Sequence, residues 1–78
     1  PWHIIRWLKQ QAQINPYVLS WVSGDTLQGR FLEPVDAPMV LAKSMYKLCP
    51  DIVDQGLGDI DVLAQQLADS GRLYFWWD

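Results

Sequence analysis

The sequence predicts an α+β domain in which a small, mostly antiparallel sheet packs with about three helices. Three observations lead to this class. Three segments carry apolar residues at helical spacing, two strand-like runs are joined by a tight turn, and a third apolar run ends the chain. The expected order is helix, strand, strand, helix, helix, strand. With 78 residues, half of them apolar, we expect one domain over 1–78, and the apolar residues directly after Pro1 indicate the C-terminal part of a longer protein.

The first part of the chain predicts a helix and then a β-hairpin. Apolar positions at helical spacing run from Trp2 to about Ile14. Pro16 ends this helix because a residue before proline is pushed out of the α region. Residues 17–22 and 26–33 are rich in strand-forming types and flank a turn, so we expect a hairpin. Gly29 is expected to mark a bulge or the close approach of another side chain.

A second helix is predicted after the hairpin. Asp36 is a suitable N-cap residue, and Pro38 fits the first helical turn. The expected buried stripe is Leu41, Met45 and Leu48. Pro50 should end this helix near Cys49.

The clearest helix boundaries in the sequence belong to the third helix. Asp59 is the expected N-cap of a helix over Ile60–Ser70, and Gly71 is placed to end it in the left-handed conformation. The apolar stripe within it follows i, i+3, i+4, i+7 spacing. The run 73–77 then predicts the last strand.

Aromatic residues are expected to form an interaction face on the sheet. Strict alternation places Tyr74 and Trp76 on one face of the last strand, and it places Tyr17, Leu19 and Trp21 on one face of the first. If three of these aromatic side chains stood bare, the patch would reach about 450–750 Å², and we expect something to cover it. The alternative is that one helix packs on each face and all five tryptophans lie in the core. The predicted interaction face is Tyr17, Trp21, Tyr74 and Trp76.

An acidic segment lies between the second and third helices. Its aspartates are Asp51, Asp54, Asp59 and Asp61. Clustered carboxylates are typical of sites for hard cations, but the spacing lacks the pattern of a calcium loop. Helix capping is the favoured role for these side chains, and Gln55, Gly56 and Gly58 fit a tight connection. We therefore predict no metal ligands here.

Charge and composition exclude several classes of function. The net charge is −3 and the six Lys and Arg residues are scattered, which argues against nucleic acids and against anionic membrane surfaces. No apolar run approaches the roughly 18 residues of a membrane span, and no signal-peptide pattern is present. Cys49 is the only cysteine, so an internal disulfide is excluded. We expect a cytoplasmic location and neither catalytic residues nor a cofactor.

Two motifs give the chain a family resemblance. CPDIVDQG at 49–56 and GRLYFWWD at 71–78 resemble the C-terminal half of a bacterial domain-of-unknown-function family, number four-two-five-three. The similarity is specific from Met45 onward. It implies no catalytic assignment, and the positions it marks as signature are Asp51, Asp54, Gln55, Gly56, Trp76, Trp77 and Asp78.

We therefore expect a small protein-interaction or accessory domain. Its aromatic face would be covered by a second copy, as a homodimer, or by an unidentified protein partner. The alternative, from a different class, is a small-molecule or divalent-metal site formed by Asp51 and Asp54 of the acidic loop together with the terminal Trp-Trp-Asp that ends at Asp78. A hydrolase that uses the two loop aspartates is the least favoured reading.

Overall fold

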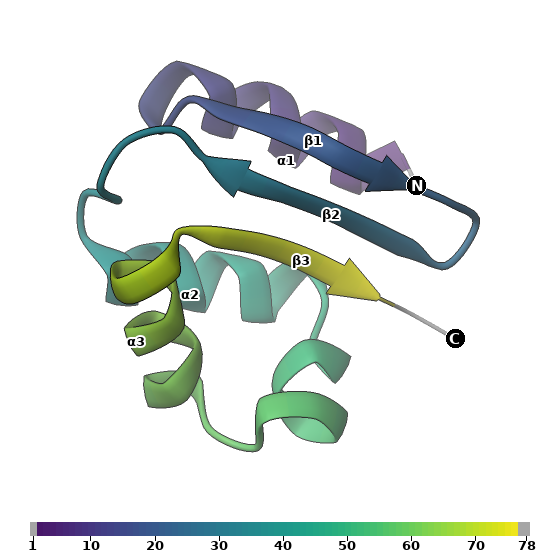
Figure 1. Ribbon diagram of the computed structural model, residues 1–78. Helices are drawn as coiled ribbons and strands as arrows, with labels where there is room; N and C mark the ends of the chain where they lie inside the picture. Colours follow the sequence, from purple (N-terminus) through teal and green to yellow (C-terminus); the bar gives the residue numbers. More distant parts are fainter. Residues whose placement is uncertain (1, 77–78) are drawn as a thin grey trace.

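A computed structural model of the chain describes residues 2–76 (Figure 1). The elements, in chain order, are α1 (Trp2–Ile14), β1 (Tyr17–Val22), β2 (Thr26–Phe31), α2 (Pro38–Leu48), η1 (Ile52–Leu57), α3 (Ile60–Ser70) and β3 (Arg72–Trp76). The α+β class and the predicted element order are confirmed. The second strand is two residues shorter than predicted, and Trp77 of the predicted last strand lies outside the described residues.

The three strands form one antiparallel sheet in the order β1-β2-β3. β2 is central, so β1 and β3 are both edge strands. Along β2, Leu27, Gly29 and Phe31 are buried, whereas the residues between them are half-buried or exposed. This period of two defines a helix-facing side of the sheet and an outer side.

β1 contains one extra residue relative to β2. Leu19 pairs with Gly29 but Trp21 pairs with Gln28, so Ser20 is the bulged residue. The glycine is required by close approach, because a Cβ at position 29 would overlap a backbone carbonyl oxygen of β1. Gly29 was expected to mark a bulge or the close approach of a side chain. The bulge lies on the neighbouring strand β1, and a backbone oxygen and the Leu19 side chain both lie close to Gly29.

The bulge changes which side chains of β1 face the helices. Tyr17 pairs with the buried Phe31 and lies on the helix-facing side, whereas Trp21 pairs with Gln28 on the outer side. The expectation that Tyr17, Leu19 and Trp21 share a face is wrong, because one inserted residue turns every later side chain over.

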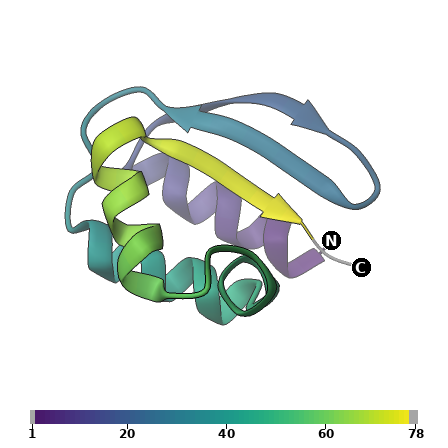
Figure 2. The same ribbon diagram turned by 60° about the horizontal axis from the view of Figure 1, so that its bottom comes forward.

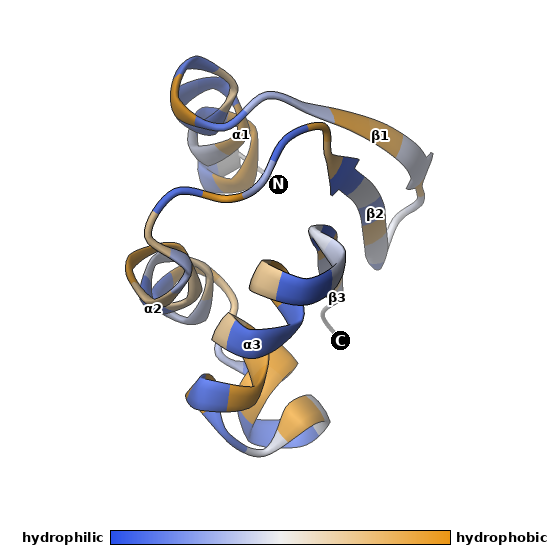
Figure 3. Ribbon diagram, turned by 60° about the vertical axis from the view of Figure 1, so that its left-hand side comes forward, coloured by the Kyte–Doolittle hydropathy of each residue, from blue (hydrophilic) through white to orange (hydrophobic). Residues whose placement is uncertain are grey.

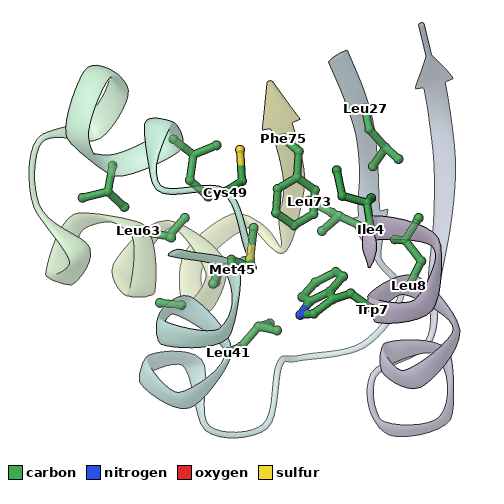
Figure 4. Packing of buried hydrophobic residues seen from close by; sticks show 14 of the residues in the cluster. Ile4, Trp7, Leu8, Leu27, Leu41, Met45, Cys49, Leu63, Leu73 and Phe75 are labelled. Carbon is green, nitrogen blue, oxygen red and sulfur yellow. The ribbon is translucent and has the colours of Figure 1, made fainter. Parts of the chain in front are cut away.

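All the helices pack on the same side of the sheet, as Figure 2 shows. The core between them holds Phe75 and Leu73 of β3, Met45 of α2 and Leu67 of α3, which are all fully buried. In Figure 4, Trp7 of α1 points toward Phe75 in this core. The two rings meet edge to face, with centroids 5.2 Å apart. The alternative of one helix on each face is wrong, and Trp21 is 59% exposed.

Both predicted ends of α3 are confirmed, whereas the predicted N-cap of α2 is wrong. Asp59 accepts a hydrogen bond from the backbone N–H of Asp61, and Gly71 ends α3 at φ 66°, as predicted. Asp36 is not the N-cap of α2. That position is Ala37, at φ 52°, without a side-chain cap. Pro38 disfavours the right-handed α region for the preceding residue, but it directs that residue toward extended backbone, so it does not explain the left-handed conformation of Ala37.

The acidic connection forms a π-helix, η1, which the sequence did not reveal. Ile52 and Val53 of η1 are buried in the core, and the N–H of Gly58 bonds to the carbonyl of Val53 to end the segment at φ 84°. Asp51 precedes η1 without a side-chain cap bond. Of the glycines expected to need positive φ here, Gly58 does and Gly56 does not.

No helix within residues 2–76 is long and apolar enough to cross a membrane.

Candidate functional site

The two motif segments lie against each other at the β3 edge of the sheet. The Cys49 thiol donates a hydrogen bond of 3.0 Å to the carbonyl oxygen of Trp76. The Trp76 ring turns toward η1, and a Cβ placed on Gly56 would lie 3.7 Å from its indole nitrogen. That distance is an ordinary van der Waals contact, so Gly56 lies directly beside the ring, and the CPDIVDQG segment packs against the end of β3.

A small pocket of about 110 Å³ opens where η1, α3 and β3 meet. Its apolar part comes from the helices, and its polar and aromatic part comes from β3 and α3. The lining residues include Met45, Ile52, Leu57, Leu63, Gly56, Gln66, Arg72, Tyr74 and Trp76. The Arg72 guanidinium lies over the Tyr74 ring, 4.7 Å from its centroid, within cation–π distance. Arg72 is the one charged residue in the lining, so the pocket has a positive rim.

The predicted acidic residues stand beside this pocket and do not line it. Asp54 is exposed and accepts a hydrogen bond of 3.0 Å from the Tyr46 hydroxyl, which together with the negative charge raises the pKa of that tyrosine. Asp51 is half-buried, Gln55 is exposed, and Asp78 lies outside the described residues. Among residues 2–76, no three His, Cys, Asp or Glu side chains gather closely enough to hold a metal ion.

Cys49 is positioned as a structural residue. It is buried and free, and burial raises the pKa of its thiol. A raised pKa keeps the thiol protonated, which is the opposite of what a nucleophilic cysteine requires. His3, the sequence's only histidine, is exposed on α1.

The predicted aromatic face is divided by the fold. Trp21 and Tyr74 lie in one cross-strand row on the outer side of the sheet, with Gln28 between them. Tyr17 lies on the other side, where its hydroxyl donates to the carbonyl oxygen of Leu8 at 2.7 Å and burial raises its pKa. Trp76 turns over the sheet edge toward η1 and packs against the core.

Two arginines on the outer side of the sheet were not among the site residues predicted from the sequence. Arg30 and Arg72 are paired across β2 and β3, directly beside the row of Trp21, Gln28 and Tyr74. Both are exposed. Their signal in the sequence was available, because period-two alternation places Arg72 on the same face as Tyr74. Attention to the aromatic residues alone missed it.

Comparisons with known proteins give a family for this fold and these motifs. The family model described as "Domain of unknown function (DUF4253)" matches residues 1–78. Neither the search of curated proteins nor the search of solved structures returned a match. The match extends over the whole length of the sequence, including the α1 and hairpin region in which the motifs are weakest. The chain belongs to the DUF4253 family.

Proposed function

We propose that this chain is a small protein-interaction domain whose outer sheet surface contacts another protein. We define the outer sheet surface as Val18, Trp21, Gln28, Arg30, Arg72 and Tyr74. One observation carries the proposal. Every helix lies on the opposite side of the sheet, so no helix within residues 2–76 covers the part of this surface on β1 and β2, whereas Arg72 and Tyr74 at the β3 edge also line the pocket beside η1 (Figure 2).

The chemistry of this surface resembles that of interface centres. Tryptophan, tyrosine and arginine are the residue types most enriched among those that dominate binding energy. Trp21 is 59% exposed and Val18 is 52% exposed, so burial of both against a partner would remove considerable apolar area from water. The sheet holds the backbone of these residues rigid, which limits the entropy lost on binding.

The charge on the outer sheet surface indicates what kind of partner fits it. Arg30 and Arg72 lie directly opposite each other, and like charges in that position destabilise a sheet. No acidic residue belongs to the surface, and no ion pair is found between residues 2 and 76. A partner that presents a carboxylate between the two arginines would relieve this repulsion with bidentate hydrogen bonds. We therefore propose an acidic patch on the partner, and a cytoplasmic setting for the encounter.

Site-specific photo-crosslinking in the native cell tests this proposal. A photoreactive benzoylphenylalanine replaces Gln28 at the centre of the outer sheet surface, and the matched control replaces the exposed Gln65 on α3. The expected result is a discrete crosslinked protein with Gln28 that is absent with Gln65 and lost on Arg30→Glu substitution. Equal crosslinking from both positions would contradict the proposal.

A second candidate function rests on the pocket beside η1. Its floor is apolar and its one charged lining residue is Arg72, so the ligand it suits is a small apolar anion and not a metal ion. The volume of about 110 Å³ is smaller than the roughly 150 Å³ cavity that holds benzene in an engineered core, which limits the buried part of the ligand to a short branched chain and leaves its carboxylate at the rim beside Arg72. This candidate is the small-molecule form of the alternative given in the sequence analysis. Its ligand is a carboxylate and not the divalent metal ion that was also considered.

This candidate is tested by titration of 3-methylbutanoate, with 3-methylbutanol as the neutral control. If the pocket binds carboxylates, tryptophan fluorescence and NMR shifts near Trp76 should respond to the acid and far less to the alcohol. Arg72→Gln should remove that difference. Identical responses to acid and alcohol in the unmodified chain would rule out a role for Arg72.

A further inference from the structure

β1 is an edge strand whose side chains do not protect it against pairing with another chain, although it carries the bulge at Ser20. Its sequence, YVLSWV, contains no charged residue and no proline, which are the residues that most often block an edge. Tyr17 is half-buried and every other residue of β1 is exposed. β1 pairs only with β2, so its outward backbone groups have no strand partner within the described chain.

The helix-facing side of this edge adds an apolar groove between β1 and α1. The groove has a volume of about 420 Å³, and it is lined by Ile4, Ile5, Leu8, Leu19, Val22, Ser23, Gly24 and Leu27. Three of its side chains remain considerably exposed: Ile5 at 49%, Leu19 at 43% and Val22 at 63%. Figure 3 shows orange along part of β1, in contrast to the blue bands on α3. The groove continues the free edge of β1, so one occupant would cover both.

We propose that β1 pairs in antiparallel orientation with β1 of a second copy of this chain. An antiparallel pair of identical strands has a two-fold axis perpendicular to the sheet, which makes the contact isologous and closed. The two sheets would join into one continuous sheet with all helices on the same side. Because α1 lies next to β1 in each copy, Ile5, Leu19 and Val22 of one chain would cover the groove of the other.

The distribution of charge favours the β1 edge over the β3 edge for pairing of two copies. Between Lys47 and Arg72 the chain carries five aspartates and no basic residue, and this acidic part forms η1 and α3 with their flanking turns. It lies next to β3, away from β1, as Figure 1 shows. Pairing through β1 keeps the two acidic parts at the far ends of the joined sheet. Pairing through β3 would bring two acidic parts of like charge together.

Sedimentation velocity over a concentration series, on the chain of residues 1–78, tests the pairing. The expected result is a monomer–dimer equilibrium without larger species. Leu19→Lys places like charges on either side of the two-fold axis and should raise the dissociation constant at least about tenfold, which corresponds to 1.4 kcal/mol. Val18→Lys tests the same edge from the outer side, in case the first variant does not fold. Circular dichroism checks the fold of each variant.

The control variant separates this pairing from the proposed partner surface. Tyr74→Ser lies on the outer sheet surface but on the other edge strand, so it should leave the dimer unchanged. A dimer that resists both lysine variants, or that is lost with Tyr74→Ser, would overturn the pairing. So would a monomer at every concentration, or open-ended growth into larger assemblies. None of these results depends on the crosslinking outcome at Gln28, so each proposal can fail alone.

Discussion

Replacing Gly29 with alanine tests the strand register on which the outer sheet surface depends. Gly29 lies in the central strand β2 and pairs with Leu19, the β1 residue that directly precedes the bulge. A Cβ there would overlap the carbonyl oxygen of Val18 and lie 3.1 Å from a methyl carbon of Leu19. The overlapping atom belongs to the backbone, so β1 itself must move to accommodate the new methyl group.

The expected cost follows from two opposing effects. Overpacking of this kind costs about 1–3 kcal/mol. Replacing glycine with alanine returns about 0.4–1 kcal/mol by restricting the unfolded chain. The two ranges combine to a loss of up to about 2.6 kcal/mol, and because the overlapping atom is backbone we expect the upper part, about 2–2.5 kcal/mol in the free energy of unfolding, or roughly 8–20 °C in melting temperature for a domain of this size.

Urea unfolding followed by circular dichroism measures this loss. Gly24→Ala is the matched control, because no atom lies within 4 Å of its added Cβ and its φ is not positive. The control should stay within about 0.5 kcal/mol of the unmodified chain. If Gly29→Ala is as stable as the control, the pairing of Gly29 with Leu19 is incorrect, and the placement of Trp21 on the outer side fails with it.

Three further predictions concern the ends of α3 and the buried thiol. Asp59→Ala removes the 2.8 Å bond from the Asp61 N–H and should cost about 1 kcal/mol in urea unfolding, most of which Asp59→Ser should restore. Gly71→Ala forces a side chain into φ 66° and should cost about 1–2 kcal/mol; a neutral effect would contradict the left-handed helix end. Because burial raises the pKa of the Cys49 thiol above 9.0, the folded state binds that proton more tightly than the unfolded state. The contribution of this raised pKa to the free energy of unfolding is present below pH 9 and is lost as pH rises through the folded pKa. Cys49→Ala should therefore reduce the loss of stability at alkaline pH. Parallel pH profiles for the two chains would refute this assignment.

Local sequence chemistry determined the elements whose ends are set by single residues. α3 was predicted to the residue, because Asp59 satisfies an N–H at its start and Gly71 accepts a backbone conformation that other residues resist. Pro16 set the end of α1 in the same way. The N-cap of α2 was misplaced by one residue, because capping preference favours Asp36 whereas the helix begins after Ala37, which makes no side-chain cap bond.

The candidate site was predicted only in outline. The two motifs were expected to matter, and they do meet through Cys49 and Trp76. The positive rim at Arg72 was missed, and the aspartates expected to form the site lie outside the pocket lining. The π-helix was missed as well, because its wide turns depend on the burial of Ile52 and Val53 and leave no periodic signal over six residues.

The sequence by itself determined the class of fold, the order of its elements and the presence of more aromatic surface than one small core needs. Only the tertiary structure decided which aromatic side chains face outward. Alternation along a strand has a period of two, so a single bulged residue at Ser20 reverses every later assignment. Two conditions accompany that bulge: β1 lies close against Gly29, and Tyr17 packs on Phe31. Both conditions are contacts between strands, and neither is visible in the residues of one strand alone.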